Sequence, residues 1–430
     1  MPELTTCEDA SAWDAFVSQA RDGSILQSWA WGSLKARYGW RVARYFWIVG
    51  DRPAAAASVL RRGLPGGLAL DYAPRGPVLD GNLEQWPAFW QALRDRLASE
   101  GGTVLKVDPE WTTEEEREVL ERTGALPSRH PIQHQATMLV DISGGDDALM
   151  RFKESTRRNI RGGARQGITV EASEASAAMD SFYELLQETA AREHFAIRSR
   201  TYYQDLLALF RDRGQVAVYL ARLENRLLAG AVMMFFGPKL VYLYGGTRSD
   251  AKDLKPGYLL HWRAIEDAQR RGGTSYDMWG VPVHPREGER GYGYYVFKSR
   301  FNGRMVRFIG LYDLAVNKAA TLTIRLAERF ARAGQPEFVR RRGRHPWPRA
   351  RPTGVGPTSP RAAGRQPAAE LALGRAAVAF WLERRAAAGR RGPPRSLLTT
   401  ANQDDLSGRR GLLRATWPGG GGGCAYATAR

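Results

Sequence analysis

The alternation of strand-like and helix-like patterns, which occurs twice along this 430-residue chain, most restricts how it can fold. In the first third, apolar residues at helical spacing alternate with short β-branched and aromatic runs, and the stretch 84–99 carries an apolar stripe from Trp86 to Leu97. The expected helices are 13–20, 29–36 and 84–99, and the expected strands are 41–49, 54–60 and 104–107. Such alternation is typical of an α/β unit in which helices cover a sheet.

A second unit of the same kind begins near Asp146. Its expected helices are 146–166, 175–194, 201–213 and 258–271, and its expected strands are 215–223, 227–236 and 241–244. Asn225 lies in the tight turn expected between the first two of these strands. The sequence therefore predicts a mixed α/β (α+β) protein with two similar modules, followed by a last helix that starts after Asn317.

Residues 340–430 differ sharply in composition from the rest of the chain. They are rich in Arg, Gly, Pro and Ala, and they contain 18 Arg, no Lys and four acidic residues. Most of the formal net charge of +18 therefore lies in this stretch, and the preceding residues are only mildly basic. Two explanations are open: a disordered tail that binds RNA, and the product of a shifted reading frame, which would have no function.

Cysteine, histidine and apolar patterns exclude several classes of protein. Cys7 and Cys424 lie near opposite ends of the chain, and the six histidines have no metal-ligand spacing, so neither a disulfide framework nor a metal site is expected. The N-terminus lacks the basic and apolar regions of a secretory signal. The longest apolar stretches, 53–60 and 229–236, are far shorter than a membrane-spanning helix. A cytoplasmic protein is expected.

Three aromatic segments between Met233 and Gly310 indicate a functional site. The segments 242–246, 276–282 and 294–301 each begin as a strand-like run and end in glycine, proline or a charge, as strands do where they deliver side chains to a pocket. Ordinary packed aromatics and a lysine that reaches solvent are the alternative. Since no nucleophile, P-loop or dinucleotide motif is present, an enzyme of this sequence would act by positioning and electrostatics.

A family resemblance follows from eight segments in order along the chain. They are 27–35, 72–77, 106–110, 153–167, 192–203, 242–246, 277–282 and 297–298. Together they resemble the FemABX family of aminoacyl-tRNA-dependent peptidyltransferases, in its compact branch without a long helical hairpin. The resemblance implies two tandem GNAT-like acyltransferase domains. The first would span 1–145, completed by a helix at 315–339, and the second 146–314.

The same resemblance implies transfer of an amino acid from aminoacyl-tRNA to the side-chain amine of a peptidoglycan stem peptide. The acceptor would be a UDP-linked or lipid-linked muropeptide precursor. The resemblance is compatible with peripheral contact between the protein and the inner membrane face. It implies no cofactor beyond the aminoacyl-tRNA co-substrate. Acyl-CoA is disfavoured as the donor because the strand-to-helix junction 253–258 has one glycine and a proline, and therefore few backbone N–H groups for a pyrophosphate. Two rivals remain: an N-acyltransferase with a non-tRNA donor, and a non-catalytic RNA-binding protein.

Individual residues take roles from this resemblance. The expected catalytic residues are Lys298, Tyr244 and Asp108, and the expected substrate-binding residues are Lys35, Arg198, Tyr202, Tyr242, Phe297 and Trp279. Lys298 would face the reacting ester or the end of the tRNA, whereas Lys35, Arg198, Tyr202 and Tyr244 match positions that hold the phosphates and stem of the precursor. Simpler roles are open for several of them: a solvated helix face for Lys35, a surface ion pair for Arg198, packing for Tyr202, and a turn for Asp108.

One further pattern stays undecided. Lys153, Arg157, Arg158, Arg161 and Arg165 recur at helical offsets, opposed only by Glu154. The stripe is suited to phosphate contacts with tRNA or with the precursor, and a solvated helix face is the alternative.

Overall fold

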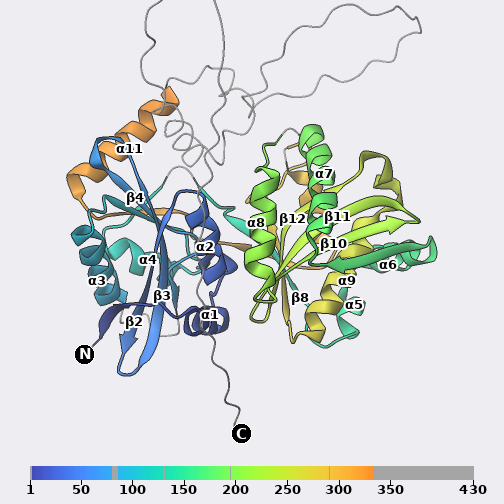
Figure 1. Ribbon diagram of the computed structural model, residues 1–430, viewed down its shortest axis with the longest axis horizontal. Coiled ribbons are helices and arrows are strands. Elements are labelled where there is room, and N and C mark those ends of the chain that lie inside the picture. The colour runs from blue at the N-terminus through green and yellow to red at the C-terminus, as the bar shows by residue number, and fades with distance from the viewer. Residues whose placement is uncertain (1, 80–85, 129–130, 194, 290, 334–430) are drawn as a thin grey trace, which may run out of the picture. The chain divides into compact units, whose positions relative to one another are not determined.

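The computed structural model describes residues 2–79, 86–128, 131–193, 195–289 and 291–333. Within these ranges the strands form two sheets, each with helices packed against it (Figure 1). The predicted mixed α/β class is confirmed. The predicted basic tail, 340–430, lies outside the described residues, as do residues 334–339 of the expected last helix.

The first sheet has eight strands in the order β1-β2-β3-β4-β6-β15-β7, with β5 paired to β3. Their bounds are β1 (Glu3–Thr6), β2 (Arg41–Val49), β3 (Arg52–Gly63), β4 (Ala69–Ala73), β5 (Val78–Leu79), β6 (Val104–Val107), β7 (Leu126–Pro127) and β15 (Tyr312–Ala315). Neighbours are antiparallel except β4 and β6, which are parallel. A parallel pair needs a long crossover connection, and this one contains α3 (Trp86–Ser99), whose aromatic side chains pack in the core beneath the sheet.

The second sheet has seven strands in the order β14-β8-β13-β12-β11-β10-β9. Their bounds are β8 (Ala136–Asp141), β9 (Ile168–Ser173), β10 (Val216–Leu223), β11 (Arg226–Phe236), β12 (Lys239–Thr247), β13 (Ser275–Gly280) and β14 (Arg304–Arg307). Only β12 and β13 are parallel, and α9 (Pro256–Arg270) connects them. Both sheets thus share one plan, in which an antiparallel three-stranded meander is followed by a helical crossover to a parallel strand.

The two sheets exchange strands across the limits expected from the sequence. β8 precedes the expected boundary at residue 145, but it pairs with β13 and β14 of the second sheet. Three of the four residues of β15 fall within the expected second domain, 146–314, but β15 lies between β6 and β7 of the first sheet. The expected limits therefore do not coincide with the sheets, because long-range pairing rather than chain order assigns each strand.

The remaining helices complete the layers. They are α1 (Ala10–Gln19), α2 (Trp29–Arg37), α4 (Glu114–Arg122), α5 (Asp147–Arg151), α6 (Glu154–Arg165), α7 (Ser176–Glu193), α8 (Arg200–Arg211), α10 (Tyr292–Ser299) and α11 (Lys318–Ala333). Side-chain caps begin several of them, as when Ser199 Oγ accepts the Tyr202 N–H at the start of α8. At the start of α11, the Thr321 hydroxyl donates to the Thr103 carbonyl at 2.7 Å, so this helix packs against the first sheet.

The predicted strand at 294–301 is wrong, because these residues belong to α10 and the turn after it. Gly291, at φ 95°, allows the chain to turn into the helix. Helical spacing then puts Phe297 and Phe301 on one face, where both rings contact Tyr258 of α9 at centroid distances of 5.1 and 5.7 Å. The predicted helix 146–166 is also divided, since Phe152 adopts an extended conformation between α5 and α6.

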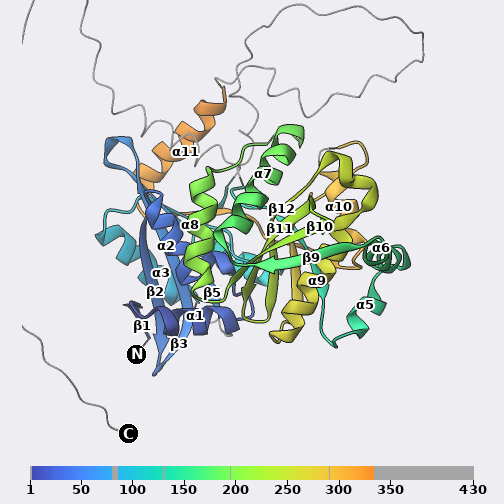
Figure 2. The same ribbon diagram turned by 45° about the vertical axis from the view of Figure 1, so that its right-hand side comes forward.

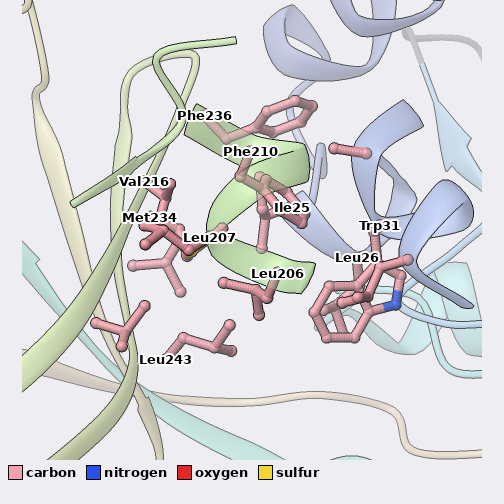
Figure 3. Packing of buried hydrophobic residues seen from close by; sticks show 14 of the residues in the cluster. Ile25, Leu26, Trp31, Leu206, Leu207, Phe210, Val216, Met234, Phe236 and Leu243 are labelled. Atoms are coloured by element: carbon pink, nitrogen blue, oxygen red, sulfur yellow. The ribbon is translucent and has the colours of Figure 1, made fainter. Parts of the chain in front are cut away.

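A continuous apolar core joins the helices and strands of the first sheet to those of the second. Figure 3 shows Ile25, Leu26 and Trp31, which come before or within α2, facing Leu206 and Phe210 of α8. All five side chains are buried. Since burying apolar surface contributes about 25 cal/mol per Å², this core fixes α2 against α8 and so sets the spacing of the polar residues beside it.

Candidate active site

Lys298 of α10 is held in a buried pocket at the end of β13. Its side chain is only 6% exposed, and Nζ donates to the carbonyl oxygens of Gly280 at 2.8 Å and Trp279 at 3.2 Å. The rings of Tyr242 and Tyr294 lie 5.7 and 5.4 Å from Nζ, within the range of cation–π attraction. An ammonium group has three N–H donors, so one remains for a further acceptor after the two carbonyls are satisfied.

The environment of Lys298 lowers its pKa. Burial disfavours the charged ammonium and brings the pKa of Lys298 to about 7, although the carboxyl group of Asp277 opposes this change. Burial, together with the Lys298 charge, also lowers the pKa of His261 to about 3, so its imidazole is neutral at physiological pH. The Lys298 amine therefore exchanges its proton near neutral pH, as an acid or a base of an active site must.

The carbonyl groups that hold Lys298 come from a strained turn. Trp279 has φ 64°, the left-handed conformation that is costly for a residue with a large side chain. Asp277 stabilises this turn, because its Oδ1 accepts the Trp279 N–H at 2.7 Å and also the Thr137 hydroxyl. A Cβ on Gly280 would overlap the ring of His134. The site therefore needs both the aspartate and the glycine.

A second group of predicted residues lies between α2 and α8. Lys35 Nζ donates to the Tyr202 hydroxyl at 3.1 Å and lies 4.5 Å from the centre of the Trp31 ring. The Arg198 guanidinium lies 5.6 Å from the centre of the Tyr202 ring. Burial, and then the neighbouring Tyr202 hydroxyl, raise the pKa of Tyr244 well above its usual value. Two cations and two phenols thus converge, a combination suited to phosphate oxygens.

Asp108 occupies a third position, at the end of β6. Its carboxylate accepts the Arg75 N–H at 2.7 Å and the Tyr72 hydroxyl at 3.1 Å. Burial raises the pKa of Asp108 to about 6, and the Arg75 charge opposes this change. The turn role left open for Asp108 is therefore present in the structure, because its bond to the Arg75 N–H supports a residue at φ 52°.

The predicted residues form three groups rather than one. A register shift in β12 puts Tyr242 against the core that contains α9 and Tyr244 against the core that contains α8. Lys298, Tyr242, Phe297 and the Trp279 carbonyl therefore belong together, whereas Tyr244 lies with Lys35, Arg198 and Tyr202, and Asp108 lies apart.

Trp279 links these three groups. Its carbonyl accepts from Lys298, its ring packs on the core that Tyr244 also contacts, and the Arg75 guanidinium lies 6.0 Å from the ring centre. The prediction omitted Asp277, His261 and Arg75. Asp277 carries a signal in the sequence, since it is a charge within the aromatic strand 276–279, and Arg75 lies in the resemblance segment 72–77, whereas His261 has no such signal.

Other classes of site are not seen among residues 2–79, 86–128, 131–193, 195–289 and 291–333. Within these ranges, no three His, Cys, Asp or Glu side chains are grouped so that they could hold a metal ion. The helices of the same ranges include none that is long and apolar enough to cross a membrane. Between 195 and 301, leaving out residue 290, the longest helix is α9 with 15 residues.

Comparison with known proteins agrees with this geometry. Residues 9–124 match the model of the FemAB family, and residues 150–299 match a model of an acetyltransferase (GNAT) domain. The lipid II:glycine glycyltransferase of Staphylococcus aureus (strain USA300) is 23% identical over 384 residues, which cover 71% of this chain and 91% of that protein. The protein of the same name from strain MRSA252 gives the same values.

Among solved structures, the crystal structure of FemX superposes with a TM-score of 0.70 and 22% sequence identity, covering 75% of this chain and 100% of FemX. The repeated plan of the two sheets and the GNAT match define the class as proteins with tandem acyltransferase domains of the GNAT type. Within that class, the resemblance to the FemABX family that the sequence predicted is confirmed by the FemAB match and by these relatives.

Proposed function

We propose that this protein is an aminoacyltransferase that moves an amino acid from aminoacyl-tRNA to the side-chain amine of a peptidoglycan stem peptide, building the interpeptide bridge of the cell wall. The FemAB match supports the proposal, as do relatives that are named lipid II:glycine glycyltransferases. The observation that carries it is the buried Lys298, whose pKa is about 7 and whose protonated amine has a third N–H beyond the two that Trp279 and Gly280 accept.

The proposed reaction is the aminolysis of an ester. The acceptor nitrogen forms an amide bond with the ester carbonyl carbon, the bond from that carbon to the tRNA ribose oxygen breaks, and the proton lost by the nitrogen ends on the ribose oxygen. Because atoms and electrons balance, the aminoacyl-tRNA is the only co-substrate that the step requires. The third N–H of Lys298 would donate to the carbonyl oxygen as negative charge develops there.

Proton transfer is the second contribution proposed for Lys298. Because the pKa of Lys298 is near neutral, its protonated amine can give a proton to the departing ribose oxygen. Tyr242, Phe297 and Trp279 would shape this pocket and keep water from the ester. Asp108, with a pKa raised to about 6, is the proposed acceptor of a proton from the attacking amine.

The phosphates of the muropeptide precursor are assigned to the second group of residues, which lies between α2 and α8. Lys35 and Arg198 supply positive charge, and the Tyr202 and Tyr244 hydroxyls supply hydrogen bonds. Both UDP-linked and lipid-linked precursors present phosphates and the same amine, so this group fits either. The proposal places the reaction in the cytoplasm, where aminoacyl-tRNA occurs, with peripheral contact to the inner membrane face if the acceptor is lipid-linked.

An acyl-CoA donor is less well supported. In α9, which follows the last strand of the second meander, Pro256 takes the first helical position and has no N–H. Lys255 before it is in the left-handed conformation. The junction therefore presents fewer backbone donors than a helix start that binds pyrophosphate.

The test mixes the purified full-length protein with radiolabelled aminoacyl-tRNAs and follows label into a UDP-linked and, separately, a lipid-linked muropeptide precursor. Transfer to either acceptor supports the proposal and identifies the amino acid. If a folded protein transfers label to neither acceptor but uses acyl-CoA, the donor proposed here is wrong. RNA binding without any transfer would instead favour the non-catalytic alternative.

A further inference from the structure

We propose that α6 and the exposed ring of Tyr294 form the docking surface for the acceptor arm of the tRNA, with Arg158, Arg161 and Arg165 contacting backbone phosphates. The inference rests on the proposed function, because it names the surface that would bring the aminoacyl ester to Lys298.

The three arginines share one face of α6. At 3.6 residues per turn, the spacing of 158, 161 and 165 puts their side chains within a narrow stripe about 10 Å long. All three are exposed. Thr156, Ile160 and Gly163 occupy the opposite face and are buried. The stripe is therefore the outward surface of a helix that is anchored by its other side.

These arginines differ from many surface arginines of the protein in forming no ion pair with a described carboxylate. Elsewhere, many exposed arginines pair with a neighbouring carboxylate, as Arg122 does with Glu118 at 3.0 Å and Arg263 with Glu266 at 3.0 Å. Across the part of the chain that the structure describes, the side chains of Arg158, Arg161 and Arg165 have no ion pair or hydrogen bond. Glu154, the one acidic residue on the stripe, lies four residues before Arg158, where helix side chains are neighbours, but the structure, which describes both residues, shows no ion pair between the two. With Glu154 counted, the stripe still has an excess of positive charge, which favours an anionic partner.

Contacts of the buried face connect α6 to the helix that carries Lys298. The Thr156 hydroxyl donates to the Arg300 carbonyl at 2.7 Å, two residues beyond Lys298. Gly163 packs on Leu259 of α9, and Lys255 Nζ lies 3.5 Å from Asn159 Oδ1. Figure 2 shows α6 beside α9 and below α10. The helix that carries the arginine stripe is therefore packed directly against the turn that follows Lys298.

Tyr294 supplies a stacking surface at that point. Its side chain is 39% exposed, and its ring centre lies 5.4 Å from Lys298 Nζ. The ring thus faces both solvent and the reacting lysine. Unpaired nucleotides at the end of a tRNA present flat bases, and such bases stack on exposed aromatic rings in proteins that bind single strands.

The same charges could attract an anionic membrane, but the geometry favours RNA. A helix that lies in a membrane interface inserts an apolar face among the lipids. In α6 that face is already covered by the protein, since Ile160 is 4% exposed. Guanidinium groups, by contrast, bind phosphates in two-point contacts without any apolar insertion.

The test compares three full-length proteins. One is the triple variant Arg158→Gln, Arg161→Gln, Arg165→Gln, and the second is wild type. The control has the same change of charge. Arg41→Gln, Arg52→Gln, Arg122→Gln removes three exposed arginines, two from the first sheet and one, paired with Glu118, from α4. The 18 arginines of 340–430 are common to all three and cannot cause a difference between them. Binding of uncharged tRNA is measured as a function of salt, and transfer kinetics are measured with aminoacyl-tRNA.

The α6 variant is expected to bind tRNA at least about 10-fold more weakly, with the slope of log K against log salt reduced by about 2 to 3. Its KM for aminoacyl-tRNA rises while its KM for the precursor does not. Tyr294→Leu is expected to raise the KM for aminoacyl-tRNA by roughly 5- to 150-fold, and Tyr294→Phe by far less.

Two results would overturn the inference while leaving the proposed function intact. One is that the wild type transfers the amino acid while the α6 variant and the control bind tRNA with equal affinity. The other is a selective loss of binding to vesicles that contain phosphatidylglycerol, with tRNA affinity unchanged. If the wild type transfers no amino acid from any aminoacyl-tRNA, it is the proposed function that fails.

Discussion

Replacing Lys298 by methionine is expected to lower transfer by at least about 100-fold and to change how the stability of the protein depends on pH. The lysine amine has an ordinary pKa of 10.5 and a pKa of about 7 in its folded surroundings. At about 1.4 kcal/mol per pH unit, keeping this group in the folded state costs about 4 kcal/mol at pH 7. Methionine has a similar length and no charge, so it removes that cost, but two buried carbonyl groups each lose a donor at about 1 to 3 kcal/mol, and the two effects nearly cancel at pH 7.

The sign of the pH dependence follows from proton binding. Between the folded pKa of about 7 and the unfolded pKa of 10.5, the unfolded lysine holds a proton that the folded lysine lacks. Raising the pH through this window therefore favours the folded state of the wild type. From about pH 7 to about pH 9, the wild type should gain about 2 kcal/mol in free energy of unfolding relative to Lys298→Met.

The assay is urea unfolding of both proteins at several pH values in that window, together with label transfer from aminoacyl-tRNA. Transfer should fall by at least about 100-fold in the variant, the scale for loss of one oxyanion donor. Parallel stability curves for the two proteins would show that Lys298 does not titrate near neutral pH. Near-normal transfer in a folded variant would remove Lys298 from the mechanism.

Three further changes test other parts of the site. Arg198→Ala should raise the KM for the precursor by more than it lowers kcat, and an unchanged KM in steady-state kinetics would move the phosphate site elsewhere. Asp277→Asn should lower kcat by roughly 10-fold or more, since the Trp279 turn loses a charged acceptor worth about 1.5 to 3 kcal/mol; an unaltered pH–rate profile would contradict this role. Gly280→Ala should destabilise the protein by about 1 to 3 kcal/mol in urea unfolding, because the new methyl group meets His134.

Local patterns predicted most of the elements, and long-range pairing decided the rest. α7, α8, α9 and the meander from β10 to β12 occur close to the predicted ranges, because each has a clear period of apolar residues. The segment 294–301 was predicted as a strand because aromatic runs favour strands, but its packing on Tyr258 stabilises a helix. No local pattern reveals that β8 joins the second sheet, since its partners β13 and β14 lie more than a hundred residues later.

The site was predictable only in part for a related reason. Lys298, Tyr242, Phe297 and Trp279 were selected as site residues, and the structure brings them together. The family resemblance gave Tyr244 a catalytic role and also matched it to the positions that hold the precursor. The register shift in β12 places its side chain with Lys35, Arg198 and Tyr202 rather than with Lys298. A single irregular residue in a strand thus changes which core a side chain enters, and the sequence carries no mark of it.

The position of β15 has a consequence for synthesis of the protein on the ribosome. β15 lies between β6 and β7, so the first sheet remains divided until residues 312–315 have emerged. During that interval the whole second sheet can form, while the edge of β6 has no partner and could pair with another chain. The first sheet therefore begins to form before the second sheet and is completed after it. A cut between the sheets would leave each fragment with a strand that belongs to the other, so the halves should not fold as separate products.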